Sequence, residues 1–222
     1  MVMTSGILVF AESDDPNFVN GDNGILYGAD DVTIIDGSNW TDEGIVLLDL
    51  TQAKRTLNVP VCKQETGYYC GPATVKQTLT CINNTAPSQS AIASAIGTTT
   101  AGSDLASMVS YINKKIPTDE EKEEYVIVKK PSKSYIQSMV NNGVTWKHPV
   151  ICRLKFSKGG SWKYSTDGHF MNANGYDNYG NKIYVTDPNI QRVDKNASGS
   201  YYVSIDELYN ATVNHFAQQM AY

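Results

Sequence analysis

Cys70 stands at a position where a thiol could act as a nucleophile. It opens the segment Cys70-Gly71-Pro72-Ala73, and apolar residues at helical spacing follow it, so the sulfur is expected at the N-terminus of a helix. Unpaired N–H groups at such an end carry partial positive charge and stabilise a thiolate. An ordinary thiol is only about 3% ionised at pH 7, so a lower pKa multiplies the nucleophile. A small buried side chain at the start of a core helix is the plainer interpretation of a lone cysteine.

His169 and Asp187 are spaced so that they could form a pair. They lie on either side of a stretch rich in turn residues, 177–181, which predicts a β-hairpin. A loop centred near Asn178 would place His169 directly opposite Asp187, with Cβ atoms about 4.5–5.5 Å apart, whereas a slip of one residue would separate them. Such a carboxylate orients an imidazole and stabilises its cation. A surface hairpin with an incidental histidine is the alternative.

Gln64 lies six residues before Cys70. A side-chain amide at this position can point an N–H at the oxyanion that forms when a thiolate attacks a carbonyl. Loss of such a donor typically lowers the rate by about a hundred- to a thousandfold. A glutamine ahead of a helix carries little information alone. The interpretation of Gln64 as an oxyanion donor therefore depends on Cys70 and His169.

The expected elements are helices first and antiparallel strands afterwards, an order typical of an α+β domain. Helix caps are expected at Ser88 and Ser103, a helix stop at Gly143, and a capping box at Ser204 and Glu207. Helices are expected at 70–82, 88–96, 103–112, 134–142 and from 204 onward, and strands at 125–128, 150–156, 169–176, 182–187 and 201–203.

The composition changes near residue 58. Before it, Gly, Asp and Asn separate short apolar runs at 24–27, 32–35 and 45–48, which predict strands and turns. We therefore expect an N-terminal β-rich appendage or pro-segment of residues 1–58, followed by a domain of residues 59–222.

The overall composition argues against several classes of protein. Of the 222 residues, 41% are hydrophobic, which is enough for a folded core. No apolar run approaches the roughly 20 residues that a membrane-spanning helix needs. The 18 basic and 23 acidic residues give a net charge of -5 without a basic stripe, which argues against nucleic-acid binding. The four cysteines form no Cys-x-x-Cys pair, so neither a metal nor a cofactor is expected.

Several of these motifs together resemble a known family, the papain-like bacteriocin-processing peptidases, which cut after double-glycine leaders, and their stand-alone relatives. The motifs are Gln64, Cys70-Gly71-Pro72-Ala73, Gly168-His169-Phe170, Gly175-Tyr176-Asp177 and Asp187-Pro188. The resemblance covers about Val59 to Phe216 and leaves the first 55 or so residues unmatched. The sequence holds neither a Walker motif nor the membrane segments of the exporter members, so peptide-bond hydrolysis is implied more strongly than leader processing during export.

The resemblance implies a papain-like cysteine peptidase fold, in which a helical subdomain with the nucleophile packs on an antiparallel sheet with the histidine and aspartate. By analogy Cys70 is the nucleophile, His169 the general base and acid, Asp187 the orienting carboxylate and Gln64 the oxyanion donor. Water or another acceptor then resolves a thioester.

Three functions are compatible with these residues. The first is a cysteine endopeptidase that acts on a peptide or protein. The second is an acyl-transfer enzyme with the same apparatus, such as a transglutaminase-like enzyme or a deamidase, and the third is an inactive binding module. Retention of all four residue types disfavours the third. The acidic, Asn- and Tyr-rich composition favours the cell surface or exterior of a bacterium, a cytoplasmic location stays open, and the sequence does not indicate an oligomeric state.

The other cysteines and nearby aromatic residues leave further questions open. Cys81 lies on the same expected helix as Cys70, roughly 16 Å away at 1.5 Å per residue, so it can share neither a zinc site nor a disulfide with it. A disulfide between Cys62 and Cys81 is compatible with the sequence. The aromatic residues near the Gly159-Gly160 loop either line a substrate groove or pack in the core or rim; they are Trp146, Trp162 and Tyr164.

Overall fold

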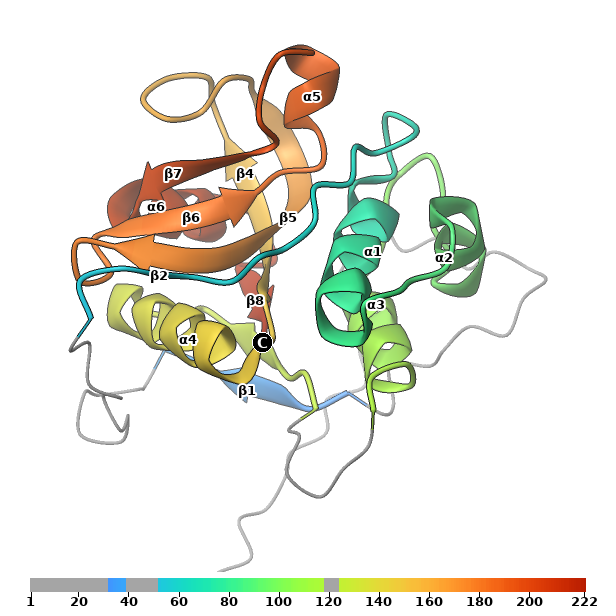
Figure 1. The fold of residues 1–222 in the computed structure, drawn as a ribbon, viewed down its shortest axis with the longest axis horizontal. Helices are drawn as coiled ribbons and strands as arrows, with labels where there is room; N and C mark the ends of the chain where they lie inside the picture. Colours follow the sequence, from blue (N-terminus) through green and yellow to red (C-terminus); the bar gives the residue numbers. More distant parts are fainter. Residues whose placement is uncertain (1–31, 39–51, 118–123) are drawn as a thin grey trace, which may run out of the picture.

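The structure, a computed structural model, describes residues 32–38, 52–117 and 124–222 (Figure 1). The helices are α1 (Cys70–Asn83), α2 (Gln89–Ala95), α3 (Leu105–Asn113), α4 (Lys133–Trp146), α5 (Ile190–Val193) and α6 (Ile205–Asn214). The strands are β1 (Ile34–Asp36), β2 (Arg55–Thr56), β3 (Ile127–Lys129), β4 (Val150–Phe156), β5 (Thr166–Asp177), β6 (Lys182–Thr186), β7 (Ser200–Ser204) and β8 (Gln219–Ala221). Within these ranges no helix is both long enough and apolar enough to cross a membrane.

The strands of the described residues form one sheet, in the order β1-β3-β8-β4-β5-β6-β7, and β2 pairs with β5 beside this path. β1 runs parallel to β3, and every other pairing is antiparallel. In Figure 1, α1, α2 and α3 form a separate group beside the strands, whereas α4 and α6 lie against the sheet. The expected α+β class is confirmed.

Two clusters of buried side chains make up the core. One joins α4 and α6 to the central strands, with Met139, Leu208 and Val185 among its members. The other joins α1, α2 and α3 to residues of the sheet that include Ile151 and Phe170. The second cluster therefore fixes the helical group against the strand that carries His169.

The helix predicted at Cys70 begins at that residue. Pro72 lies in its first turn, where a missing N–H removes no helical hydrogen bond. Tyr69, which precedes the helix, makes no side-chain capping bond. Val75 and Leu79 are buried among the other helices, which explains why this helix packs where it does.

One of the expected helix caps is wrong. Ser88 does cap α2, because its hydroxyl accepts a hydrogen bond from Ala91 N at 3.2 Å. The cap of α3 is Asp104, which accepts from Ser107 N at 2.8 Å, rather than Ser103. Ser103 Oγ instead shares a hydrogen bond of 2.8 Å with Thr98 Oγ1 in the preceding loop.

The stop expected at Gly143 is also wrong, because α4 continues through this residue to Trp146. A Cβ at Gly143 would run into the carbonyl oxygen of His148, so the glycine serves a close approach of the chain rather than a helix end. The helix ends instead at Trp146, and the residue that follows it, Lys147, is the C-cap with a left-handed φ of 61°. The capping box at Ser204 is confirmed and opens α6.

The β5–β6 hairpin forms, but its register differs from the expected one. Thr186 pairs with Asn172, which lies two residues from the partner expected for it, and a bulge at 173–175 shifts the ladder further. On the His169 side of the bulge the slip is two residues, which keeps side chains on their expected face. Asp187 therefore becomes a diagonal rather than a direct neighbour of His169. Diagonal neighbours are still within reach of long side chains.

Parts of the expected appendage belong to the sheet. β1, which overlaps the strand predicted at 32–35, pairs with β3, and β2 pairs with β5. The strands predicted at 24–27 and 45–48 lie outside the described residues. The division of the chain at residue 58 stays a prediction.

Candidate active site

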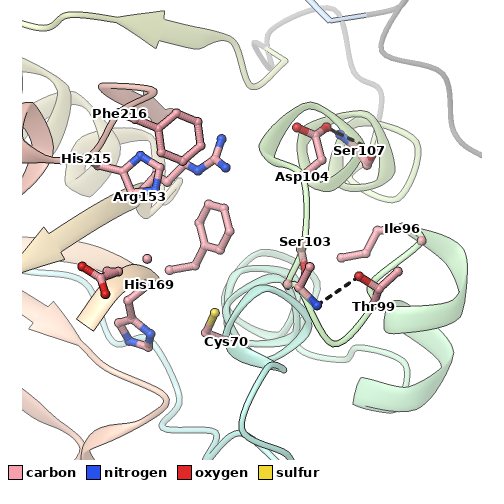
Figure 2. Close-up of a pocket in the computed structure, with 16 residues that line it drawn as sticks. Cys70, Ile96, Thr99, Ser103, Asp104, Ser107, Arg153, His169, His215 and Phe216 are labelled. Carbon is pink, nitrogen blue, oxygen red and sulfur yellow. Dashed lines mark hydrogen bonds between the residues drawn. The ribbon is translucent and has the colours of Figure 1, made fainter. Parts of the chain in front are cut away.

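The structure brings Cys70 and His169 together from two different parts of the fold. Cys70 is supplied by the first turn of α1 and His169 by β5, and Figure 2 shows the two side chains on facing sides of one pocket. Each group shifts the pKa of the other, so the imidazole lies within interaction range of the thiol. More than ninety residues of chain separate them, so the contact depends on how the helical group packs on the sheet.

Asp187 lies on the far side of the imidazole from the thiol. His169 Nε2 and Asp187 Oδ1 are 2.9 Å apart, and the two side chains are 4% and 0% exposed. Because Nε2 is engaged by the carboxylate, Nδ1 is the ring nitrogen left for the sulfur. His169 and Asp187 thus form a buried pair, and Cys70 lines the same pocket as the histidine.

The carboxylate of Asp187 is fully enclosed by hydrogen-bond donors. Oδ1 accepts from Asn189 N at 2.8 Å in addition to its contact with His169. Oδ2 accepts from Tyr164 OH at 2.9 Å and from Tyr201 OH at 3.0 Å. A buried carboxylate needs such donors to remain ionised.

Aromatic rings cover the imidazole of His169. The edges or faces of Phe156 and Tyr164 meet it at centroid distances of 6.4 and 5.8 Å, with interplanar angles of 87° and 85°. Trp162 stacks on Phe156 at 4.1 Å. Trp162 and Tyr164 therefore pack behind the histidine rather than lining the cleft in front of it, and Trp146 is 56% exposed at the end of α4.

Neighbouring charges shift the pKa values of all three groups. Burial raises the pKa of the Cys70 thiol, but the hydrogen bond to His169 and its charge outweigh burial and lower the pKa below 9.0. Burial lowers the pKa of His169, but the charge and hydrogen bond of Asp187 outweigh it and raise the pKa above 6.5. Burial likewise opposes ionisation of Asp187, and His169 together with backbone and hydroxyl donors lowers its pKa. These directions favour a thiolate beside an imidazolium.

Gln64 is buried close to the pair of His169 and Asp187. Its backbone N donates to Pro188 O at 2.9 Å, directly beyond Asp187 in sequence. Its side-chain Nε2 donates to Thr66 O at 2.8 Å, and Oε1 finds no partner among the described residues. The second N–H of the amide is the group that an oxyanion could engage.

Buried glutamines hold the segment that carries Gln64. Gln89 Nε2 donates to Lys63 O at 2.8 Å, and Gln89 Oε1 accepts from Glu65 N at 3.0 Å. Gln77 Nε2 donates to Cys62 O at 3.3 Å. Two helices therefore fix the backbone on both sides of Gln64, a role that the sequence analysis does not predict.

A cleft of about 290 Å³ begins at Cys70 and His169 and runs between the helical group and the sheet (Figure 2). The helical wall is the loop 97–104, which precedes α3, and the opposite wall includes Arg153, Phe170 and Phe216. The cleft is open to solvent, and half of the Phe216 side chain is exposed.

All four cysteines of the chain are free thiols, so the disulfide between Cys62 and Cys81 does not form in this structure. Among the described residues, no three His, Cys, Asp or Glu side chains lie together as a metal site would require. Neither Tyr164, which is expected only in a groove or in packing, nor Tyr201 has a spacing along the sequence that points to Asp187.

The helical group that faces an antiparallel sheet, with a cleft between them, is the fold of the papain-like cysteine peptidases. Recombinant stem bromelain precursor superposes with a TM-score of 0.52 at 14% identity, over 80% of this chain and 72% of that one. The Amb a 11 cysteine protease, a major ragweed pollen allergen, in its proform gives a TM-score of 0.50 at 13% identity, over 77% and 64% of the two chains.

The chain belongs to the Peptidase_C39 like family, whose model matches residues 56–217. This confirms the resemblance that the motifs indicate. The peptidase domain of Streptococcus ComA, a bi-functional ABC transporter involved in a quorum sensing pathway, is also similar, with a TM-score of 0.47 and 14% identity over 74% of this chain and 97% of that one. A search of curated proteins gives no significant match.

Proposed function

We propose that the protein is a cysteine endopeptidase that cleaves peptide bonds through a thioester acyl-enzyme. The observation that carries this proposal is that Cys70 lines the same cleft as His169, whose imidazole is paired with the buried carboxylate of Asp187. A thiol poised toward the thiolate supplies a nucleophile, and an imidazole poised toward its cation supplies a proton for the leaving group. Both groups line the cleft between the helical group and the sheet, where we place the peptide.

In the first half of the proposed reaction, the Cys70 thiolate attacks the carbonyl carbon of the scissile peptide bond. The Gln64 amide and the backbone N–H of Cys70, which has no intrahelical acceptor in the first turn, donate to the oxyanion. The cationic His169 then gives its proton to the leaving amine, the C–N bond breaks, and the acyl group stays on sulfur as a thioester.

In the second half, neutral His169 takes a proton from a water molecule as the water attacks the thioester. The C–S bond breaks, the product leaves with a new carboxyl group, and the thiolate and imidazolium are restored. Asp187 holds the proton on Nε2, so that Nδ1 exchanges protons with the substrate and water.

The test compares the wild type with the Cys70→Ala and His169→Ala variants, and uses Cys81→Ala as a matched cysteine control. Each is incubated with a combinatorial library of unmodified peptides, with and without an added primary amine, and products are identified by mass spectrometry. We expect hydrolysis products from the wild type and Cys81→Ala alone. Cleavage by Cys70→Ala equal to that by the wild type would show that Cys70 is not the nucleophile. Products that carry the added amine would favour acyl transfer over hydrolysis.

A further inference from the structure

Two tyrosines from separate elements converge on one oxygen of Asp187. Tyr164 comes from the loop between β4 and β5, and Tyr201 comes from β7. Their hydroxyl oxygens lie 2.9 and 3.0 Å from Oδ2, and Tyr164 also lies 3.1 Å from Oδ1. Nothing in the spacing of these residues along the chain brings them together, so the convergence is produced by the fold.

The two oxygens of Asp187 have different partners. Oδ1 meets the imidazole of His169, the backbone N–H of Asn189 and, at 3.1 Å, the Tyr164 hydroxyl. Oδ2 meets the Tyr164 hydroxyl at the shorter distance and is the only oxygen that Tyr201 contacts. Rotation of the carboxylate would break this set of contacts, because each donor is held by a different element. The hydroxyls therefore determine which oxygen faces the imidazole.

The hydroxyls of both tyrosines remain protonated and so remain hydrogen-bond donors. Burial, followed by the charge of Asp187, raises the pKa of Tyr164 and of Tyr201 far above 10, so each hydroxyl keeps its proton. Tyr164 also presents a ring edge to His169, and Trp162 presents one to Tyr201 at 6.4 Å. Neither tyrosine lines the cleft that Cys70 and His169 share.

We propose that Tyr164 and Tyr201 are positioning residues, which keep Asp187 ionised and keep Oδ1 directed at His169. Charge-assisted hydrogen bonds of this kind are roughly twice as strong as neutral ones. The inference rests on the proposed function, since it concerns how the same cysteine and histidine are kept reactive. Its consequence is that the fraction of Cys70 present as thiolate depends on two phenols that never touch the sulfur.

The test uses Tyr201→Phe, Tyr164→Phe and the double variant, which remove the hydroxyls and keep the rings. The matched control is Tyr202→Phe on the same strand, because the Tyr202 ring lies 4.8 Å from that of Tyr184, tilted by 47°, and Tyr202 is not among the hydrogen-bond partners of Asp187 in the described residues. For each variant, the rate of Cys70 alkylation by iodoacetamide is measured as a function of pH, with thermal unfolding as a check of folding.

We expect the midpoint pH of Cys70 alkylation to rise in each single variant and to rise further in the double variant. We also expect kcat to fall by roughly tenfold per lost hydroxyl with KM unchanged. In an Asp187→Asn background, Tyr201→Phe should have no further effect on either quantity, because the hydroxyl acts through the carboxylate.

Three results would overturn the inference. These are a midpoint that stays with the Tyr202→Phe control, a midpoint that falls, or an effect of Tyr201→Phe that is undiminished in the Asp187→Asn background. Failure of the proposed function would look different, since the wild type itself would then show no alkylation below neutral pH that depends on His169.

Discussion

The surroundings of Cys70, Cys81 and Cys152 shift the pKa values of their thiols in different directions. Burial raises the pKa of Cys81 to about 11, and it raises that of Cys152 as well, with a small opposing contribution from a backbone hydrogen bond. At Cys70 the imidazole of His169 reverses the effect of burial. The neighbouring imidazole thus separates Cys70, the proposed nucleophile, from the thiols of Cys81 and Cys152.

This contrast predicts selective alkylation. Because the pKa of Cys70 is lowered, its thiolate forms as the pH rises through that lowered value, so iodoacetamide should modify Cys70 already at pH 6. Each unit of pKa difference changes the thiolate fraction by about tenfold, so Cys81 and Cys152 should stay unmodified. Peptide mapping by mass spectrometry measures this. In His169→Ala the advantage of Cys70 should disappear, and preferential labelling that persists there would show that the imidazole is not its cause.

Gln64 gives a second prediction at this scale. If its amide donates to the oxyanion, Gln64→Ala should lower kcat by about a hundred- to a thousandfold and change KM little. Gln137→Ala is the matched control, because Gln137 Nε2 also donates to a backbone carbonyl, that of Gly180 at 3.1 Å, but on α4. Steady-state kinetics of both variants measure the effect, and equal kcat values for the two would remove Gln64 from the reaction.

At the scale of helices and strands, local signals in the sequence predict most elements and fail where tertiary contacts decide. Ser88 and the capping box at Ser204 act within one turn, so their helices begin where expected. Ser103 and Gly143 carry the same kinds of signal, yet the first is engaged by Thr98 and the second meets the backbone of His148. The local sequence pattern does not predict contacts between distant segments. For the same reason the register of the β5–β6 hairpin differs from the expected one.

The close approach of α1 to the loop that walls the cleft gives a prediction for an element. A Cβ on Gly71 would lie 2.6 Å from Ser103 Cβ, so Gly71→Ala should overpack this contact. The better helix propensity of alanine offsets part of the cost, which leaves a net loss of about 1–2 kcal/mol in the free energy of unfolding. Urea unfolding measures it.

Gly67→Ala is the matched control, because a Cβ there meets nothing within 4 Å and should change stability by less than about 0.5 kcal/mol. Ser103→Gly, which removes the opposing side chain, should recover most of the loss in Gly71→Ala. Equal stability of Gly71→Ala and Gly67→Ala would mean that the loop yields freely and that the wall of the cleft is not fixed by this contact.

At the scale of the whole molecule, the candidate site exists only because the helical group and the sheet meet in one orientation. The residue types of the site are readable from the sequence, since Cys70, His169 and Gln64 lie in short motifs. The residues that hold Asp187 cannot be predicted from the sequence, because Tyr164 lies in a loop and Tyr201 on a strand, and only the assembled sheet brings them together. Polar contacts between the helical group and the sheet likewise cannot be predicted from the sequence.

Asn172 makes the central contact of that junction. It lies on β5 and is fully buried; its Nδ2 donates to Thr74 O at 3.3 Å and to Gln77 Oε1 at 3.1 Å, and its Oδ1 accepts from Thr78 Oγ1 at 3.0 Å. Asn172→Ala should therefore lower the free energy of unfolding by about 2–4 kcal/mol, because it leaves several buried groups of α1 unpaired. It should also slow Cys70 alkylation at pH 6, because α1 carries Cys70 and β5 carries His169.

The comparison with Asn113→Ala separates these two effects. Asn113 makes a similar pair of hydrogen bonds, to the backbone N and O of Tyr125 at 2.9 and 3.0 Å, but it ties α3 to the segment before β3. Its loss should lower stability in urea unfolding and leave the alkylation rate of Cys70 unchanged under conditions where the protein is folded. If both variants slow alkylation equally, reactivity follows general stability. If Asn172→Ala alone slows it, the junction between α1 and β5 sets the distance from sulfur to imidazole, and the reactivity of the cysteine is a property of the assembled molecule.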